Sequence, residues 1–154
     1  MTMESPLVNA FIFLFEREIG KLDAEIRQYP DEDSLWRTTG DIINPAGNLC
    51  LHLCGNLQHY IGANLGDTGY VRDRPREFAA KGILRKDLLQ EIQTTKNNVL
   101  STLRTLDDNN IHVLYPENVL GYPMTIFFFL NHLFGHLSYH LGQINYHRRI
   151  IAAK

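Results

Sequence analysis

The long apolar segment at the end of the chain places the strongest constraint on its fold. From Tyr122 to about Ala152, histidines recur at a spacing of four, at His132, His136 and His140. At 3.6 residues per turn, such positions lie on one side of a helix, each displaced by about 40° from the last. Apolar residues share that side, so the helix must pack against other elements. The segment therefore predicts a helix that carries imidazoles along the edge of an apolar core.

Three further stretches have the alternating three-and-four spacing of apolar residues that bundle helices show. They are expected at about Pro6 to Gln28, Asn44 to Leu65 and Leu84 to Leu106. For the first of them, Ser5 is a suitable N-cap, and Tyr29-Pro30 ends the helix because the residue before proline avoids helical geometry. Four long helices in one small domain predict an all-α fold, a four-helix bundle.

The connections refine this prediction. A polar segment, GDTGYVRDRPREFAAKG, separates the second and third helices, with a short helical turn expected at Arg76 to Ala80. A link of this length permits a crossover along the outside of the bundle, so a simple up-down order is not required. Leu35 and Trp36 are expected to cover one end of the core, and IHVLYPENVLGYP to include a strand-like stretch. We expect one domain over residues 1–154.

Charge and hydropathy exclude several classes of protein. The formal net charge is −2, from 15 basic and 17 acidic residues, which gives no electrostatic basis for binding nucleic acid or an anionic membrane. The early apolar run LVNAFIFLF lacks a basic flank and a cleavage site, so it is not interpreted as a signal peptide. The run MTIFFFL is too short to span a bilayer. With two cysteines and no disulfide framework, a cytoplasmic location is expected.

The histidine spacing predicts a metal site. Two imidazoles at i and i+4 of one helix can bind one metal ion. His52, near the middle of the second helix, is the candidate third ligand, and it can meet His136 and His140 if the two helices are neighbours. The alternative is a set of core histidines with satisfied nitrogens. For His132, packing or a supporting hydrogen bond is favoured over direct ligation.

Three neutral imidazoles with open positions describe a catalytic rather than a structural metal site. Zinc and nickel suit such ligands, and iron and copper remain open. No Glu or Asp of the second or last helix stands beside the proposed ion as a general base. Tyr139 and His59 are weak candidates for that role.

Other polar residues receive less specific interpretations. His59 and Asn56 either orient His52 or serve as exposed or capping groups. Cys50 and Cys54 lie about 160° around the helix from His52 and are interpreted as packing residues or exposed thiols.

Outside these helices, the charged run from Arg72 to Glu77 is more often a solvated crossover with internal ion pairs than a site for an anionic substrate. His112 and His147 have no supporting pattern and are expected at the surface.

Three pieces of the chain resemble a known group of proteins. HLCGNLQHYIG, GYVRDRPREF and HLFGHLSYHLGQI resemble the DinB/YfiT-like superfamily of metalloenzymes, most closely its DinB-like domains of unknown function with HLxGNL on helix two. The resemblance covers nearly the whole chain. It implies a four-helix bundle with a crossover between helices two and three, and a divalent ion held by His52, His136 and His140. Many members read His-His-Arg-Gly-Gln where this chain has Tyr139 to Gln143, which puts the role of that arginine in doubt.

The resemblance also implies an activity. Members include thiol transferases, thiol-dependent isomerases and hydrolases, which implies a small-molecule substrate and, in some cases, a low-molecular-weight thiol. One alternative is a non-catalytic, stress-related bundle that binds metal. Another is a purely structural bundle whose histidines cluster without binding an ion.

The apolar surface predicts self-association. MTIFFFL is apolar nearly all round its helix, which one bundle interior cannot cover. Several aromatic and aliphatic residues lie outside the expected core stripes: Phe11, Phe13, Leu14, Phe127 and Phe128. Because large exposed apolar patches usually mark interfaces, we expect a homodimer through the first and last helices. The alternative is that the segments around Leu35 and Trp36, or Ile111 to Leu114, cover these rings within one chain.

Overall fold

The computed structural model describes residues 5–153; residues 1–4 and 154, the ends of the expected domain, lie outside the described part. Within that part, helices and turns make up the structure, with isolated β-bridges but no strand. The long helices are α1 (Pro6–Arg27), α2 (Ala46–Leu57), α5 (Arg85–Leu103) and α6 (Ile126–Ala152). The predicted all-α bundle is confirmed.

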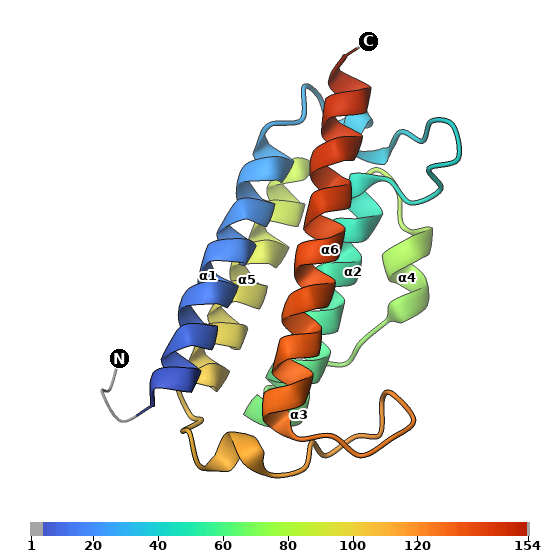
Figure 1. Ribbon diagram of the computed structural model, residues 1–154. Helices are drawn as coiled ribbons and strands as arrows, with labels where there is room; N and C mark the ends of the chain where they lie inside the picture. Colours follow the sequence, from blue (N-terminus) through green and yellow to red (C-terminus); the bar gives the residue numbers. More distant parts are fainter. Residues whose placement is uncertain (1–4, 154) are drawn as a thin grey trace.

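The four long helices pack around one core, with the short helix α4 (Arg74–Ala79) outside it (Figure 1). In the view of Figure 1, α1 and α6 run upward, whereas α2 and α5 run downward. Helices α1 and α2 each pack against both α5 and α6, and α4 packs on α2. Because α2 and α5 run in the same direction, the chain between them must return along the outside. It does so through α4, which confirms the predicted crossover.

Helix α1 has the predicted span but a different cap. Ser5 stands at the N-cap position and makes no side-chain capping bond. Instead, the Asp108 carboxylate accepts hydrogen bonds from the backbone N–H groups of Leu7 and Val8. A carboxylate is favourable there because the first N–H groups of a helix carry partial positive charge. The cap comes from the start of the α5–α6 connector, 100 residues from Val8 in the chain and beyond the reach of local patterns.

The second helix changes its geometry part-way. After α2, the π-helical turn η2 (Gln58–Ala63) is followed by α3 (Asn64–Gly66), and Asp67 ends the run with a left-handed φ of 50°. The predicted end near Leu65 is confirmed. A π turn inserts an extra residue, so every side chain beyond Leu57 faces a different direction from that on a regular helical wheel.

The linker before α2 covers one end of the core as expected. Leu35, in the short helix η1 (Asp33–Trp36), is fully buried. The Trp36 ring lies over Gly47 of α2, where a Cβ atom would approach the ring to 2.7 Å. At the other end, the connector contains the helix η3 (Asn110–His112) and an isolated bridge between Leu114 and Thr125, the expected strand-like stretch.

The aromatic residues outside the predicted stripes divide into two groups. Phe11 is buried, against the prediction, because the Phe127 ring packs edge-on with its centroid 5.8 Å away. The His112 ring of the connector also contacts Phe127, with 5.8 Å between the ring centroids. Phe13 and Phe128 remain 62% and 47% exposed. The connector therefore covers part of this surface, and the dimer stays a prediction. No helix in the described part of the chain combines the length and the apolar character that crossing a membrane requires.

Candidate metal centre

Three histidines from two antiparallel helices meet beside the core. His52 lies in the middle of α2, and His136 and His140 occupy consecutive turns of α6. One ring nitrogen from each lies within 4.8 Å of the others. The Nε2 atoms of His52 and His136 are 3.1 Å apart. Two imidazoles bound to one tetrahedral ion at about 2.0–2.2 Å have nitrogens separated by little more than this.

A buried carboxylate orients His52. The Nδ1 atom of His52 lies 3.0 Å from Oε1 of Glu77, which comes from α4 and is 3% exposed. Because a carboxylate only accepts, Nδ1 carries the proton and the Nε2 lone pair faces His136. Metal-binding histidines usually have such a partner, which sets the tautomer and the direction of the ring.

An arginine keeps that carboxylate charged. Arg72 donates from Nε to Oε2 and from Nη2 to Oε1 of Glu77, both at 2.9 Å. Burial by itself raises the pKa of the Glu77 carboxyl, but hydrogen bonds from Arg72 and His52, with their charges, bring the pKa below its ordinary value. Glu77 is therefore an anion at neutral pH, and its carboxylate accepts hydrogen bonds from both Arg72 and His52.

The HLCGNL segment makes room for this carboxylate. A Cβ atom on Gly55 would overlap the Glu77 carboxylate. The buried Asn48 side chain donates to the backbone carbonyls of Glu77 at 3.0 Å and Ala80 at 2.8 Å, which fastens α4 to α2. One helix thus supplies a ligand candidate and the space for the group that orients it.

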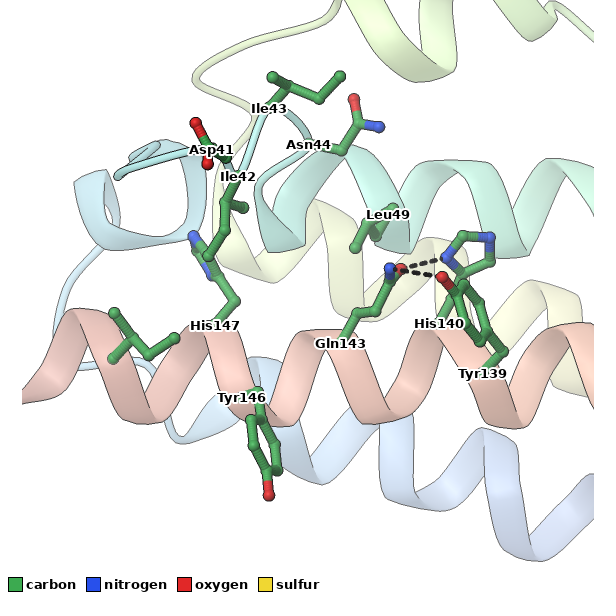
Figure 2. A pocket seen from close by; sticks show the side chains of 11 residues that line it. Asp41, Ile42, Ile43, Asn44, Leu49, Tyr139, His140, Gln143, Tyr146 and His147 are labelled. Carbon is green, nitrogen blue, oxygen red and sulfur yellow. Dashed lines mark hydrogen bonds between the residues drawn. The ribbon is translucent and has the colours of Figure 1, made fainter.

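His140 is oriented in the same way by its own helix. Its Nδ1 atom lies 2.7 Å from Oε1 of Gln143, and the Gln143 amide donates to the Tyr139 hydroxyl at 3.2 Å (Figure 2). Because the Gln143 oxygen accepts from Nδ1, the other nitrogen of His140 is free to face the cluster. His136 has no such support, since its buried Nδ1 atom has no hydrogen-bond partner among the described residues.

Two histidines of the cluster, His136 and His140, have lowered pKa values. Burial, and then the nearby rings of His140 and His52, lower the pKa of His136 to about 4. Burial also lowers the pKa of His140, against a smaller opposite effect of Gln143. Neutral imidazole is the form that binds metal. The converging nitrogens, the oriented rings of His52 and His140, and the low basicity of His136 and His140 all fit a divalent ion.

The chain matches a family model over residues 3–154, described as protein of unknown function DUF1572. It belongs to the DUF1572 family. This family is DinB/YfiT-like, in agreement with the resemblance seen in the sequence. No curated protein and no solved structure matches the chain significantly. Membership of DUF1572 therefore establishes the family of the chain, but the description of that family names no activity.

The remaining sequence candidates in this DUF1572 protein lie around the cluster. His132 stacks on Phe129 at 5.6 Å and is exposed, which agrees with the packing role favoured for it. His59, displaced by the π turn, contacts Glu117 of the connector at 3.2 Å. Asn56 is buried, and its side-chain oxygen has no partner within residues 5–153. Tyr139 is exposed and tied to His140 through Gln143.

The cysteines are packing residues. Cys50 and Cys54 are both buried and free of disulfide bonds. Their mutual hydrogen bond, together with burial, raises the pKa of the Cys50 thiol, so it stays protonated.

The interpretation of the charged run is right in one part and wrong in another. Arg72 and Glu77, its two end residues, form an internal ion pair as expected, but this pair is buried behind His52 instead of solvated. The carboxylate in contact with His52 thus comes from the crossover, outside the two helices that the sequence analysis considered. The Asp73 cap and Pro75 signal the short helix, yet no periodicity shows which side of it faces α2.

His147 is also misplaced by the sequence analysis. It is 2% exposed, with Nδ1 2.7 Å from the Tyr29 hydroxyl and Nε2 2.7 Å from the Arg37 carbonyl. Both nitrogens are satisfied, so this histidine is a structural one. His112, in contrast, is exposed as expected.

Proposed function

We propose that this protein binds a divalent metal ion at His52, His136 and His140 and acts on a small-molecule substrate as a hydrolase or thiol transferase. The convergence of three imidazoles, with Glu77 orienting one of them, carries the proposal. Zinc and nickel suit a site of imidazole ligands, and the cytoplasm is the expected location. When bound, such an ion lowers the pKa of a water or thiol at an open position.

The residues around the cluster have different parts in this proposal. Both oxygens of Glu77 already accept hydrogen bonds, so Glu77 positions His52 and does not act as a base. The Tyr139 hydroxyl accepts a bond from Gln143 and keeps its own proton to donate. Of the two weak candidates, Tyr139 is favoured over His59 for proton transfer, because His59 contacts Glu117 instead of the cluster.

A non-catalytic metal-binding protein is the second candidate. It is favoured by the absence, among the described contacts of the cluster, of a carboxylate with a free oxygen. A binding protein needs the three imidazoles and their supports, but no base.

Metal analysis of protein purified without a histidine tag or chelating column tests the proposal first. We expect stoichiometric zinc or nickel, located by anomalous scattering at the three histidines. The metal-loaded protein is then screened with ester and amide substrates, and with small thiols plus electrophiles. Turnover that His136→Ala abolishes supports the enzyme, and stoichiometric metal without turnover supports the binding protein. Protein that takes up no added zinc refutes both and leaves a purely structural bundle.

The homodimer belongs to the same proposal. Phe13 and Phe128 leave aromatic surface in water on helices α1 and α6. Burying apolar surface contributes about 25 cal/mol per Å², which favours a second copy over that face. Sedimentation over a wide concentration range tests this, and a strict monomer at high concentration rules the dimer out.

A further inference from the structure

A pocket of about 520 Å³ lies between the C-terminal half of α6 and the loop that precedes α2 (Figure 2). His140 forms one end of it, and Leu49 of α2 lies beside that end. Ile42 and Ile43 of the loop form the opposite wall. Pockets that bind small molecules usually have volumes of about 300–1,000 Å³.

The wall of the pocket is already ordered. The Ile42 backbone N–H donates to the Thr39 carbonyl at 3.0 Å, in a turn where Gly40 has a positive φ of 54°. His147 of α6 binds the Arg37 carbonyl just before this turn. The loop is thus tied to the helix it faces, so a ligand would not have to order it.

Large apolar side chains around this pocket are left in solvent. Ile43 is 80% exposed, and Tyr146 and Ile150 of α6 are 65% and 43% exposed. Single exposed apolar residues are ordinary, but a group of them around one cavity marks a binding site.

The charges select the class of ligand. Among the described residues that line the pocket, Asp41 is the only one with a charged side chain, and no lysine or arginine is present. An anionic ligand would therefore lose its hydration in the pocket without gaining a cationic partner. A neutral ligand does not carry this cost, and a cationic ligand meets the Asp41 carboxylate.

The polar groups stand at the end nearest the cluster. Tyr139, His140 and Gln143 form a connected set there, and His140 belongs both to the pocket wall and to the histidine cluster. A molecule with an apolar body and a polar group at one end would match this division.

We infer that this pocket binds the substrate, and that the substrate is a neutral or cationic small molecule with an aromatic or branched apolar body and a polar end group. The inference rests on the proposed function, since it names the substrate class of that centre. Its consequence is that carboxylate-bearing molecules are poor ligands of the pocket.

Binding of three small probes with one ring and different charges tests the inference. Benzyl alcohol, benzylamine and benzoate are titrated into protein with isoleucine methyl labels, followed by NMR. We expect the first two to shift the methyls of Ile42, Ile43 and Ile150, with buried Ile26 and Ile92 unaffected. Benzoate should bind at least about tenfold more weakly than benzylamine, since it meets a carboxylate and no cation.

Substitution at an exposed wall residue separates this pocket from general apolar surface. Ile150→Glu should weaken benzyl alcohol binding at least about tenfold, since it places a charge at the apolar wall. Val71→Glu, at an exposed apolar residue of the crossover, is the matched control and should leave binding unchanged. Equal weakening by both variants, absence of shifts at the pocket methyls, or benzoate binding as tightly as benzylamine overturns the inference.

Repeating the titration on EDTA-treated and zinc-loaded protein separates the two proposals. Probe binding in the pocket without any zinc uptake supports the pocket and refutes the metal centre. Zinc uptake without probe binding supports the metal centre and refutes the pocket.

Discussion

Helix α6 carries two kinds of inward-facing histidine, and their comparison shows what distinguishes a ligand candidate from a structural residue. His147 has a hydrogen-bond partner on each nitrogen, Tyr29 on one side and the Arg37 carbonyl on the other. In the cluster, His140 and His52 each have a partner on Nδ1, and their remaining nitrogens face His136. Burial lowers the pKa of His136, His140 and His147 alike. The direction of the pKa shift therefore does not separate the two regions, whereas the count of occupied nitrogens does.

The largest effect on zinc binding is expected when a cluster histidine is removed. His136→Ala should abolish zinc binding and leave a folded helical bundle, because the packed α1 and α5 do not involve the ion. Isothermal titration with zinc and circular dichroism measure the two effects. His132→Ala, on the same helix, is the control and should bind zinc normally. A random-coil spectrum of the wild-type protein after chelation would show instead that the metal is structural.

The next largest effect concerns the group that orients His52. Glu77→Gln should lower zinc affinity about 10–100-fold, the usual range for groups behind a metal ligand. The amide loses the charge that Arg72 and the His52 ring both contact. Competition with a chelator of known affinity measures the change, and unaltered affinity would mean that Glu77 serves only to fasten α4.

Two glycine-to-alanine substitutions test the same contact through steric overlap, without a change of charge. Gly55→Ala should lower zinc affinity in the same direction, because its Cβ atom would displace the Glu77 carboxylate. Gly20→Ala is the matched control, since nothing lies within 4 Å of the added atom. That control should leave zinc affinity unchanged and stabilise α1 by about 0.5–1 kcal/mol. Equal zinc affinity in the two variants would contradict the role assigned to Gly55.

These contacts also show which features of the fold and of the site could be predicted from the sequence. The seams of α1 and α5, the apolar α6 and the meeting of His52 with the His136–His140 pair were predicted from periodicity and the family resemblance. Glu77 was missed because the crossover has no repeat that relates it to His52. The π turn after Leu57 was missed because no local signal marks an inserted residue.

His147 shows a different limit. It follows His136 by eleven residues, which is only about 20° around the helix, so a helical wheel places both on one side. Their difference lies in partners from distant segments, Tyr29 and Arg37. Sequence spacing could therefore predict which histidines face inward, but not which of them have a nitrogen left for a metal.

A smaller effect is expected from His147, and it is on stability. His147→Phe keeps the ring but removes two hydrogen bonds, leaving the Arg37 carbonyl unpaired, while Tyr29 can still donate to the Ile144 carbonyl. We expect a loss of about 1–3 kcal/mol in the free energy of unfolding, measured in urea. Zinc affinity should stay within about twofold of wild type, because the site is distant. A large loss of zinc affinity would instead show that His147 contributes to the metal site.

The smallest effect is the pH dependence of stability in the metal-free protein. Burial lowers the pKa of His147, against a smaller opposite effect of the Arg37 carbonyl, so the folded protein binds its proton less readily than the unfolded chain does. Its contribution to stability is therefore complete above the ordinary histidine pKa of about 6.5 and declines as the pH falls below it.

His147→Phe removes this contribution, so its stability should fall less than that of wild type between pH 8 and pH 5, values chosen to bracket about 6.5. His136 and His140 titrate in the same direction and remain in both proteins, which confines the difference to His147. The neighbouring Glu25 carboxyl does not interfere, because hydrogen bonds from Arg148 and Asn145 outweigh its burial and lower its pKa, so it loses its charge only in stronger acid. Urea unfolding of both proteins across this range gives the slopes. Equal slopes would mean that His147 titrates alike in the folded and unfolded chain, and that its burial does not hold it neutral.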